Sequence, residues 1–197
     1  MSKHYKTNYN QKIISNIERI VQENHFEGEV ADIIINAFSF MIKKKLLGGC
    51  HVLSTLIYVA LNELKYNAKL LCGECQYLDK LPFDHSWVTL NEKIIDIAIY
   101  YPLSEYFGGL GAPIAFDIDT IDLKPTIMRY GINTGLPFSD ETKFAIDSTI
   151  TQYMDKYPHE ENGLWTVLER DIFPYEDELN VEGLKEKYRT VRRTVVR

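Results

Sequence analysis

The sequence lacks both a secretory signal and a long apolar run. Residues 1–10 are polar and contain neither the apolar stretch nor the small-residue cleavage site of a signal peptide. The longest apolar run, residues 52–61, is shorter than the roughly 20 residues that span a bilayer. These absences predict a cytoplasmic protein with no membrane partner.

Cysteine is scarce, and negative charge exceeds positive charge. The chain of 197 residues contains three cysteines, and an odd number without an export signal predicts free thiols rather than a disulfide framework. The net charge of −6 gives no general electrostatic reason to bind nucleic acid. Four arginines lie close together near the C-terminus, Arg189, Arg192, Arg193 and Arg197, and we interpret them as a solvated helix end or frayed terminus without a functional role.

Internal repeats, low-complexity segments and linkers are also absent, so the length favours a single domain over residues 1–197. The sequence does contain helical apolar periodicity towards both ends and strand-like segments in the middle. Helices are expected around 13–21, 30–47, 50–64, 140–154, 161–172 and 181–191, and strands at 66–72, 85–90, 93–99, 114–118 and 126–132. This order predicts an α+β fold with helices packed on an antiparallel sheet.

Two glycines directly precede Cys50, and the apolar run 52–61 follows it. Glycine lets a chain turn sharply, so Gly48 and Gly49 predict a loop that ends where a helix begins. Cys50 would then lie in the first turn of that helix, where the helix dipole and unpaired backbone N–H groups favour the thiolate over the thiol. A cysteine in this position can act as a nucleophile near neutral pH.

A predicted β-hairpin tests which other side chains lie together. If Asn91 and Glu92 form a two-residue loop, Trp87 lies opposite Asp96 and His85 lies diagonal to Asp96, with Cβ atoms about 7 Å apart or less. His85, Trp87 and Asp96 then share one face, whereas a three-residue loop would separate them. The opposite face collects apolar residues and is a candidate core face: Val88, Leu90, Ile95, Ile97 and Ile99.

Covalent catalysis by a thiol needs a nucleophile, a base that accepts its proton and an acidic group that orients the base. The sequence offers Cys50, His85 and Asp96 in that order, embedded in Gly48-Gly49-Cys50, Tyr66-Asn67-Ala68, Asp84-His85-Ser86-Trp87-Val88 and Ile94-Ile95-Asp96. This combination resembles the core of the transglutaminase-like superfamily, a variant of the papain-like fold. The resemblance covers residues 48–99 and implies that Cys50 is the nucleophile, His85 the base and Asp96 its orienter.

The resemblance implies a papain-like core, preceded by N-terminal helices and followed by a helical extension. It also implies an acyl-transfer enzyme that forms a thioester at Cys50 with a peptide, amide or ester substrate. Water is favoured as the acyl acceptor, in an amidase or peptidase-type hydrolase, because hydrolysis needs no second binding site. The Cys50 N–H is one oxyanion donor, and the sequence identifies no second one.

Two other functions remain open, and the oligomeric state is not determined by the sequence. An arylamine N-acetyltransferase-like acyltransferase shares the Cys, His, Asp order, although that family usually has Arg-Gly-Gly-Xaa-Cys, and Lys45-Leu46-Leu47 precedes the glycines here. A non-catalytic binding module that keeps the fold is the third hypothesis.

Four further motifs have simpler explanations than a site, so no cofactor and no metal is expected. Cys72-Gly73-Glu74-Cys75 has the spacing of a redox or zinc pair, but no helix or second ligand pair follows, which favours a core or strand-end role. His51 would point about 100° away from Cys50 on a helix, towards the surface or behind the nucleophile. Asp117, Asp119 and Asp122 are expected to be strand carboxylates rather than a calcium loop. Gly108-Gly109-Leu110-Gly111 is expected to be a loop bordering the site rather than a phosphate cradle.

Overall fold

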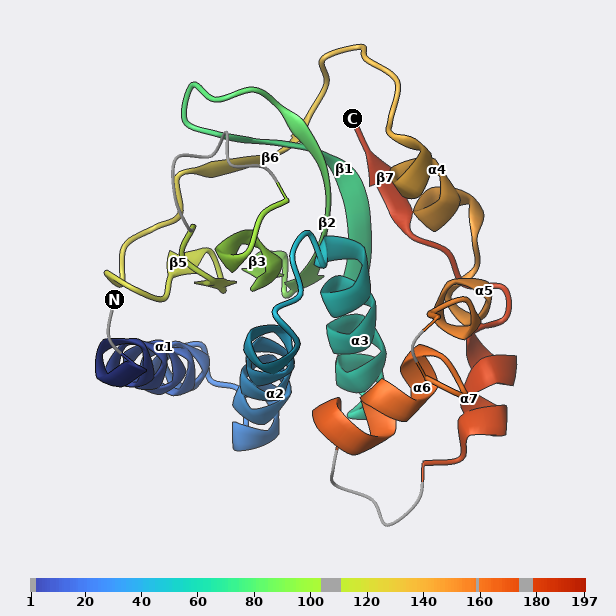
Figure 1. The fold of residues 1–197 in the computed structure, drawn as a ribbon, viewed down its shortest axis with the longest axis horizontal. Helices are drawn as coiled ribbons and strands as arrows, with labels where there is room; N and C mark the ends of the chain where they lie inside the picture. The colour runs from blue at the N-terminus through green and yellow to red at the C-terminus, as the bar shows by residue number, and fades with distance from the viewer. Residues whose placement is uncertain (1–2, 104–110, 159, 174–178) are drawn as a thin grey trace.

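A curled, mainly antiparallel sheet forms the centre of the α+β fold in the computed structural model, which describes residues 3–103, 111–158, 160–173 and 179–197. The strand order is β5-β4-β3-β2-β1-β6, and a last strand, β7, also pairs with β1 (Figure 1). The strands are β1 (Lys69–Tyr77), β2 (Phe83–Leu90), β3 (Lys93–Asp96), β4 (Ile114–Ala115), β5 (Ile118–Asp119), β6 (Met128–Ile132) and β7 (Thr194–Val196).

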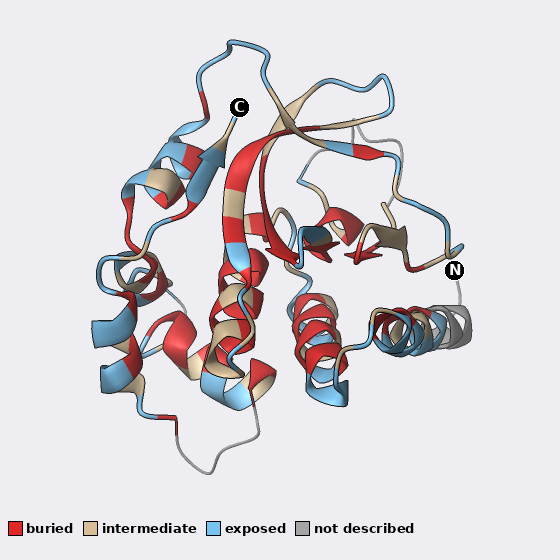
Figure 2. Cartoon of the chain, turned by 180° about the vertical axis from the view of Figure 1, so that it is seen from behind, coloured by how far each residue is buried: buried red, intermediate tan, exposed pale blue. Residues whose placement is uncertain are grey.

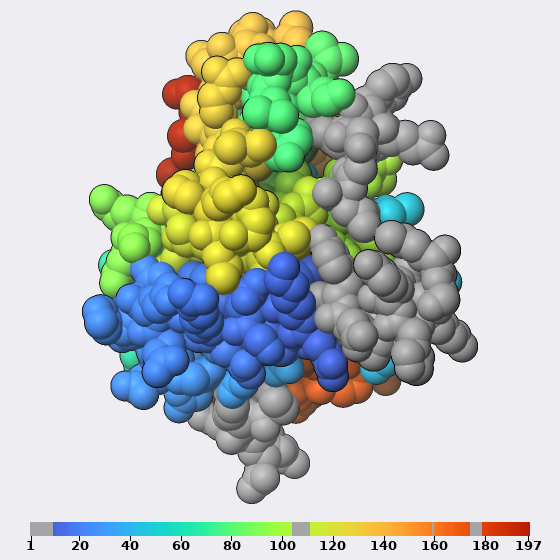
Figure 3. Space-filling view, turned by 90° about the vertical axis from the view of Figure 1, so that its left-hand side faces the viewer, coloured from blue at the N-terminus to red at the C-terminus, as the bar shows by residue number. Residues whose placement is uncertain are grey.

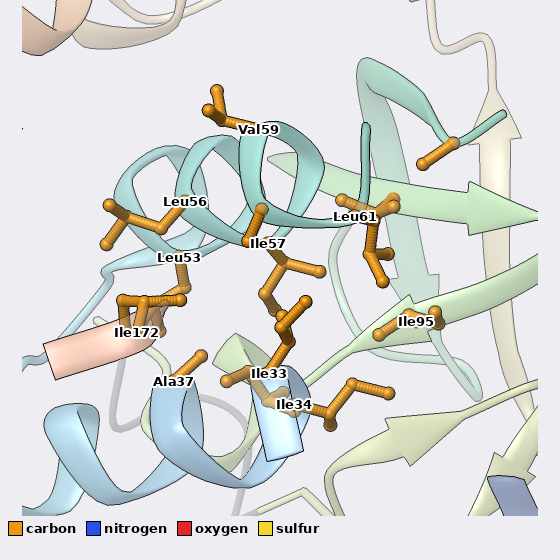
Figure 4. Packing of buried hydrophobic residues seen from close by; sticks show 14 of the residues in the cluster. Ile33, Ile34, Ala37, Leu53, Leu56, Ile57, Val59, Leu61, Ile95 and Ile172 are labelled. Atoms are coloured by element: carbon orange, nitrogen blue, oxygen red, sulfur yellow. The ribbon is translucent and has the colours of Figure 1, made fainter. Parts of the chain in front are cut away.

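Three helices precede the sheet in the chain, as the apolar periodicity predicts. They are α1 (Lys3–Glu23), α2 (Gly28–Lys44) and α3 (Cys50–Glu63), and α3 packs against β1 and β2. Figure 4 shows apolar side chains in the space between α2 and α3, among them Ile33, Ile34 and Ile57, with Ile95 of β3 close by. The labelled core residues include Ile33, Ile34, Ala37, Leu53, Ile57 and Ile95, each 1% exposed or less.

The N-terminal helix also covers the far edge of the sheet. Asn16 of α1 donates a hydrogen bond from Nδ2 to the Thr120 carbonyl, 2.7 Å away. Figure 3 shows α1 in blue directly beneath the yellow segment that follows β5. Buried residues concentrate on α3, on the facing side of α2 and on the sheet, whereas the outer faces of α4 and α7 are exposed (Figure 2). None of the helices in the described part of the chain combines the length and apolarity that crossing a membrane would require.

The β2–β3 hairpin has the predicted register. Leu90 pairs with Lys93 and Val88 with Ile95, and Asn91 and Glu92 both have positive φ, 49° and 63°, as a type I′ turn requires. The two faces separate as expected, because Val88, Leu90, Ile95 and Ile97 join the main core. Trp87 instead belongs to a second cluster that also contains Cys75, Ile99, Ile114 and Met128.

The prediction of a strand to residue 99, with Ile99 on the main core face, is wrong. Strand β3 ends at Asp96, and a 3₁₀ turn, η1 (Ala98–Tyr100), follows it. Asp96 Oδ1 accepts the Ala98 N–H at 3.1 Å, a local bond through which aspartate favours turns. The turn carries Ile99 into the second cluster.

The C-terminal third contains shorter helices than the periodicity predicts. The helix expected at 140–154 is two helices, α4 (Asp140–Asp147) and α5 (Ile150–Asp155), because Thr149 forms a capping box with Gln152 and starts a new helix. The segment expected at 161–172 contains α6 (Leu164–Val167) and then a π-helical segment, η3 (Leu168–Ile172). The last helix is α7 (Val181–Tyr188).

The interpretation of the arginine-rich tail as a solvated or frayed end is wrong for Arg193 and for residues 194–196, whereas Arg189, Arg192 and Arg197 are exposed. Residues 194–196 form β7, which runs parallel to β1 with Val195 opposite Cys72. Arg193 is 5% exposed, and the guanidinium of Arg197 lies 4.1 Å from the centre of the Phe138 ring. No local pattern indicates this pairing, because the partner strand lies more than 100 residues away in the sequence.

We expect Gly73→Ala to loosen β7 from the sheet. A Cβ on Gly73 would lie 2.3 Å from the Val196 carbonyl oxygen, so one of the two strands would have to move. The expected loss is about 2 kcal/mol or more in the free energy of unfolding, measured by urea denaturation. Gly28→Ala is the matched control, because nothing lies within 4 Å of the added methyl group. Equal midpoints for the two variants would contradict the packing of β7 on β1.

Candidate active site

A tight turn before α3 places Cys50. Gly48 has a φ of +62°, and its N–H donates to the Tyr101 carbonyl at 2.8 Å, which fixes the turn against the segment after η1. The positive φ favours glycine at this position, and an added side chain would also displace Leu103. Helix α3 begins at Cys50 itself, as predicted, so the N–H of Cys50 is one of the helix-start donors that no intrahelical carbonyl satisfies.

His85 and Asp96 meet on the hairpin in the arrangement that its register predicts. His85 Nε2 lies 2.7 Å from Asp96 Oδ2, and both side chains are at least 95% buried. Because Nε2 is engaged by the carboxylate, Nδ1 is the ring nitrogen left for Cys50. Cys50 lies close enough to the His85 ring for its sulfur to affect the pKa of His85, so Cys50, His85 and Asp96 lie in one group.

Opposing effects set the charge of His85. Burial acts to lower its pKa, but the Asp96 carboxylate and the Cys50 sulfur together raise the pKa of His85 to about 10. The imidazolium form of His85 is therefore favoured at neutral pH. A histidine cation beside a cysteine is an arrangement that nucleophilic cysteine chemistry uses, because positive charge favours a thiolate.

Tyr130 is a half-buried partner of Asp96 that the sequence reasoning missed. Its hydroxyl donates to Asp96 Oδ2 at 2.7 Å, to the same oxygen that binds His85. Burial and the Asp96 charge raise the pKa of Tyr130 well above its usual value, so the hydroxyl remains a donor. Together with the Ala98 N–H, three donors hold the Asp96 carboxylate in one orientation. No local motif marks Tyr130, because it reaches the site through pairing of β6 with β1.

His51 lies beside the site rather than at the open surface. Its Nδ1 lies 2.7 Å from Ser86 Oγ and its Nε2 lies 3.2 Å from Thr142 Oγ1, so the ring joins α3 to β2 and α4. Burial, followed by the nearby charges of Arg193 and His85, lowers the pKa of His51 to about 3. The ring is therefore neutral at pH 7 and adds no positive charge to the site.

Arg193 supports the first turn of α3 from behind. Its guanidinium donates to the Ala145 carbonyl at 2.7 Å, to the His51 carbonyl at 3.2 Å and to Thr55 Oγ1 at 2.6 Å. It also lies 4.1 Å from the centre of the Tyr153 ring. Burial lowers the pKa of Arg193. The C-terminal segment, given no functional role in the sequence analysis, thus fixes the helix that carries Cys50.

A pocket of about 400 Å³ opens beside Cys50 and His85. Residues from the turn before α3, from β2, from the turn after β3 and from α4 line it: Gly48, Cys50, His51, Phe83, Asp84, His85, Ala98, Ile99, Pro102, Leu103, Ser139, Glu141 and Thr142. Its size suits one large side chain or a short peptide segment. The sulfur of Cys50 is therefore beside a space that can hold an acyl compound.

The other candidate motifs lie elsewhere. Cys72 and Cys75 are free, completely buried thiols inside β1, and burial raises the pKa of Cys72 to about 11. The aspartates after β4 accept backbone N–H groups, with Asp117 bonding Ile94 and Asp119 bonding Ile121. No group of His, Cys, Asp or Glu with the geometry of a metal site occurs among the described residues. Residues 108–110 of the glycine-rich segment lie outside the described residues.

Comparison of the chain with protein-family models, with curated proteins and with solved structures finds no match in any of the three.

We expect His51 to make the protein less stable in acid. An unfolded histidine takes up a proton below about pH 6.5, whereas native His51 stays neutral down to about pH 3, so unfolding consumes a proton between these values. Stability should therefore fall as the pH falls through this window. Replacing the ring by His51→Gln should reduce the drop in unfolding free energy between pH 7 and 4.5 by about 2 kcal/mol, measured by urea titration at each pH.

The exposed His25 provides the control for this effect. His25→Asn should leave the drop between pH 7 and 4.5 as it is in the wild type. Parallel pH profiles for His51→Gln and the wild type would mean that His51 is not held neutral by its surroundings.

Proposed function

We propose that this protein is a cysteine-dependent acyl-transfer enzyme with a papain-like core of the transglutaminase-like type, most simply a hydrolase of amides or esters. The observation that carries the proposal is the group formed by Cys50, His85 and Asp96, in which Cys50 at a helix start and His85 lie on the wall of a pocket and Asp96 bonds His85 from behind. Nucleophile, base and orienting group each have a specific partner, which is the arrangement that covalent catalysis requires.

In the first half-reaction, the Cys50 thiolate attacks the carbonyl carbon of the substrate. The carbonyl oxygen becomes an oxyanion, which the N–H of Cys50 at the start of α3 can stabilise. The His85 imidazolium then gives its proton to the leaving amine or alcohol as the carbon–heteroatom bond breaks. The products are a thioester on Cys50, the released amine or alcohol and a neutral His85.

In the second half-reaction, neutral His85 takes a proton from water as the water oxygen attacks the thioester. The carbon–sulfur bond breaks, the acid is released and Cys50 leaves as a thiolate beside the His85 imidazolium. An amine can replace water in this step with the same proton transfer. Asp96 stays ionised throughout, holds the ring through Nε2 and stabilises the imidazolium.

The electrostatics of the site suit this cycle. The pKa of His85 is raised partly by the Cys50 charge. When the thiolate attacks, its negative charge moves from sulfur to the substrate oxygen, so one of the causes that hold the proton on His85 is weakened. His85 therefore becomes a better acid at the step in which the leaving group needs a proton.

Two alternatives are separated by experiment. Transfer of an acyl group from the enzyme to an added arylamine, in preference to water, would favour the N-acetyltransferase-like activity. An inert Cys50 would favour a non-catalytic binding module.

The reactivity of Cys50 tests the proposal without knowledge of the substrate. At pH 6 to 7, iodoacetamide should label Cys50 faster than Cys72 or Cys75 by a factor on the order of 100 or more, because only Cys50 has an imidazolium partner. His85→Ala should remove most of this advantage, and the exposed-site variant His25→Asn should not. Peptide mass spectrometry of partially labelled protein measures both effects. Equal labelling of the three cysteines would count against an activated nucleophile.

The third member of the triad is tested by turnover of a small activated ester. Asp96→Asn should lower turnover by up to about 10⁴-fold, because an amide does not stabilise the imidazolium. Tyr130→Phe keeps the Asp96 charge and two of its three donors, so we expect a loss of only about tenfold. Asp96 is buried, so the variant is also expected to be less stable, and turnover is measured well below its melting temperature. Unchanged turnover in folded Asp96→Asn would remove Asp96 from the triad.

A further inference from the structure

The pocket beside Cys50 has two carboxylates and no lysine or arginine among its described lining residues. Asp84 lies on β2 next to His85, and Glu141 lies in the first turn of α4. Asp84 Oδ2 accepts the Ser139 N–H at 2.6 Å, which fixes this carboxylate between β2 and the start of α4. Glu141 is exposed on the same side of the pocket.

The rest of the pocket wall is apolar. Phe83 comes from β2, and four residues come from the segment after β3: Ala98, Ile99, Pro102 and Leu103. An apolar group gives up less hydration free energy on entering this space than a charged group does. The apolar wall offers a charged group few polar contacts to replace the water that it loses. The two carboxylates then decide which sign of charge is tolerated at the edge of the pocket.

The cations near the pocket do not cancel this negative charge. The His85 imidazolium is balanced by Asp96 and by the Cys50 thiolate. Arg193 lies behind the first turn of α3, where it binds the His51 carbonyl, and Lys156 lines a neighbouring cavity that shares His51 and Glu141 with the pocket. Lys143 of α4 pairs with Asp140 at 2.9 Å. His51, which faces the pocket directly, is neutral at pH 7.

We propose that the pocket selects an acyl donor that is apolar beside the reacting carbonyl and carries a positive charge, and that it rejects donors with a carboxylate in this position. This inference rests on the proposed function, because it assigns the substrate class of the Cys50 site. A lysine- or arginine-containing peptide with an apolar residue at the reactive carbonyl has this chemistry. An acidic peptide, or one that ends in a free carboxylate next to the scissile bond, does not.

The charge preference can be measured at Cys50 with a matched pair of thiol reagents. Two methanethiosulfonates of similar size, one ending in trimethylammonium and one in sulfonate, transfer their thioalkyl group to the thiolate as the sulfinate leaves. The ratio of their rate constants at Cys50, divided by the same ratio for free 2-mercaptoethanol, reports the field of the pocket alone. At low ionic strength we expect a normalised ratio of about ten in favour of the cation.

Removal of one rim charge should reduce this preference. Glu141→Gln and Asp84→Asn should each lower the normalised ratio by about threefold, and 0.5 M salt should lower it in the wild type. Glu141 is exposed, so Glu141→Gln is expected to fold even if Asp84→Asn disturbs the start of α4. Glu18→Gln on the exposed face of α1 is the control of equal charge change and should leave the ratio unaltered.

The outcomes separate the inference from the function on which it rests. Two results would overturn the charge preference while Cys50 remains the selectively labelled cysteine. One is a normalised ratio near one, and the other is a ratio that Glu141→Gln and Asp84→Asn leave unchanged. Either result would leave the acyl-transfer proposal standing. If neither reagent labels Cys50 in preference to Cys72 and Cys75, both proposals fail.

Discussion

The buried hydrogen bond between His85 Nε2 and Asp96 Oδ2, 2.7 Å long, is the contact on which the candidate site depends. It joins the two strands of one hairpin, so it exists only in the register that the type I′ turn at Asn91 and Glu92 imposes. A shift of that register by one residue would turn Asp96 to the other face of the sheet. Because Nε2 of His85 bonds Asp96, Nδ1 is the ring nitrogen left for Cys50. The local geometry of a two-residue turn thus controls the alignment of the chain of three side chains.

Elements distant in sequence hold this arrangement in place. Tyr130 of β6 binds the same oxygen of Asp96 as His85 does, and Arg193, just before β7, binds the carbonyl of the residue after Cys50. Both strands pair with the same strand, β1, whose edge opposite β2 is divided between β7 at residues 71–73 and β6 at residues 74–77. The close approach of β7 requires Gly73, since any side chain there would meet the Val196 carbonyl. One strand therefore holds in place the segments that support both Asp96 and Cys50.

The two histidines near Cys50, His85 and His51, differ in charge. The imidazole of His85 is surrounded by negative charge and favours its protonated form, whereas the imidazole of His51 lies near Arg193 and His85 and stays neutral. Both rings line the same pocket, but only His85 bonds Asp96. The neutral ring of His51 instead connects α3 with β2 and α4 through Ser86 and Thr142. A histidine that directly follows Cys50 in the sequence thus has a different charge from the histidine that faces Asp96.

The sequence by itself determined those structural features that depend on residues close together in the chain. The start of α3 at Cys50 follows from the two glycines, and the common face of His85, Trp87 and Asp96 follows from the two-residue turn, because both are set by backbone geometry over a few residues. Local patterns did not reveal that the strand ends at Asp96, because the Asp96 side chain itself bonds the Ala98 N–H. The roles of Tyr130 and Arg193 were decided only by tertiary structure. The strands β6 and β7 lie more than 50 and more than 100 residues from β1 in the sequence, so their pairing depends on packing of the whole sheet. Arg193 is buried only because β7 pairs with β1 and the His51 carbonyl of α3 accepts its guanidinium.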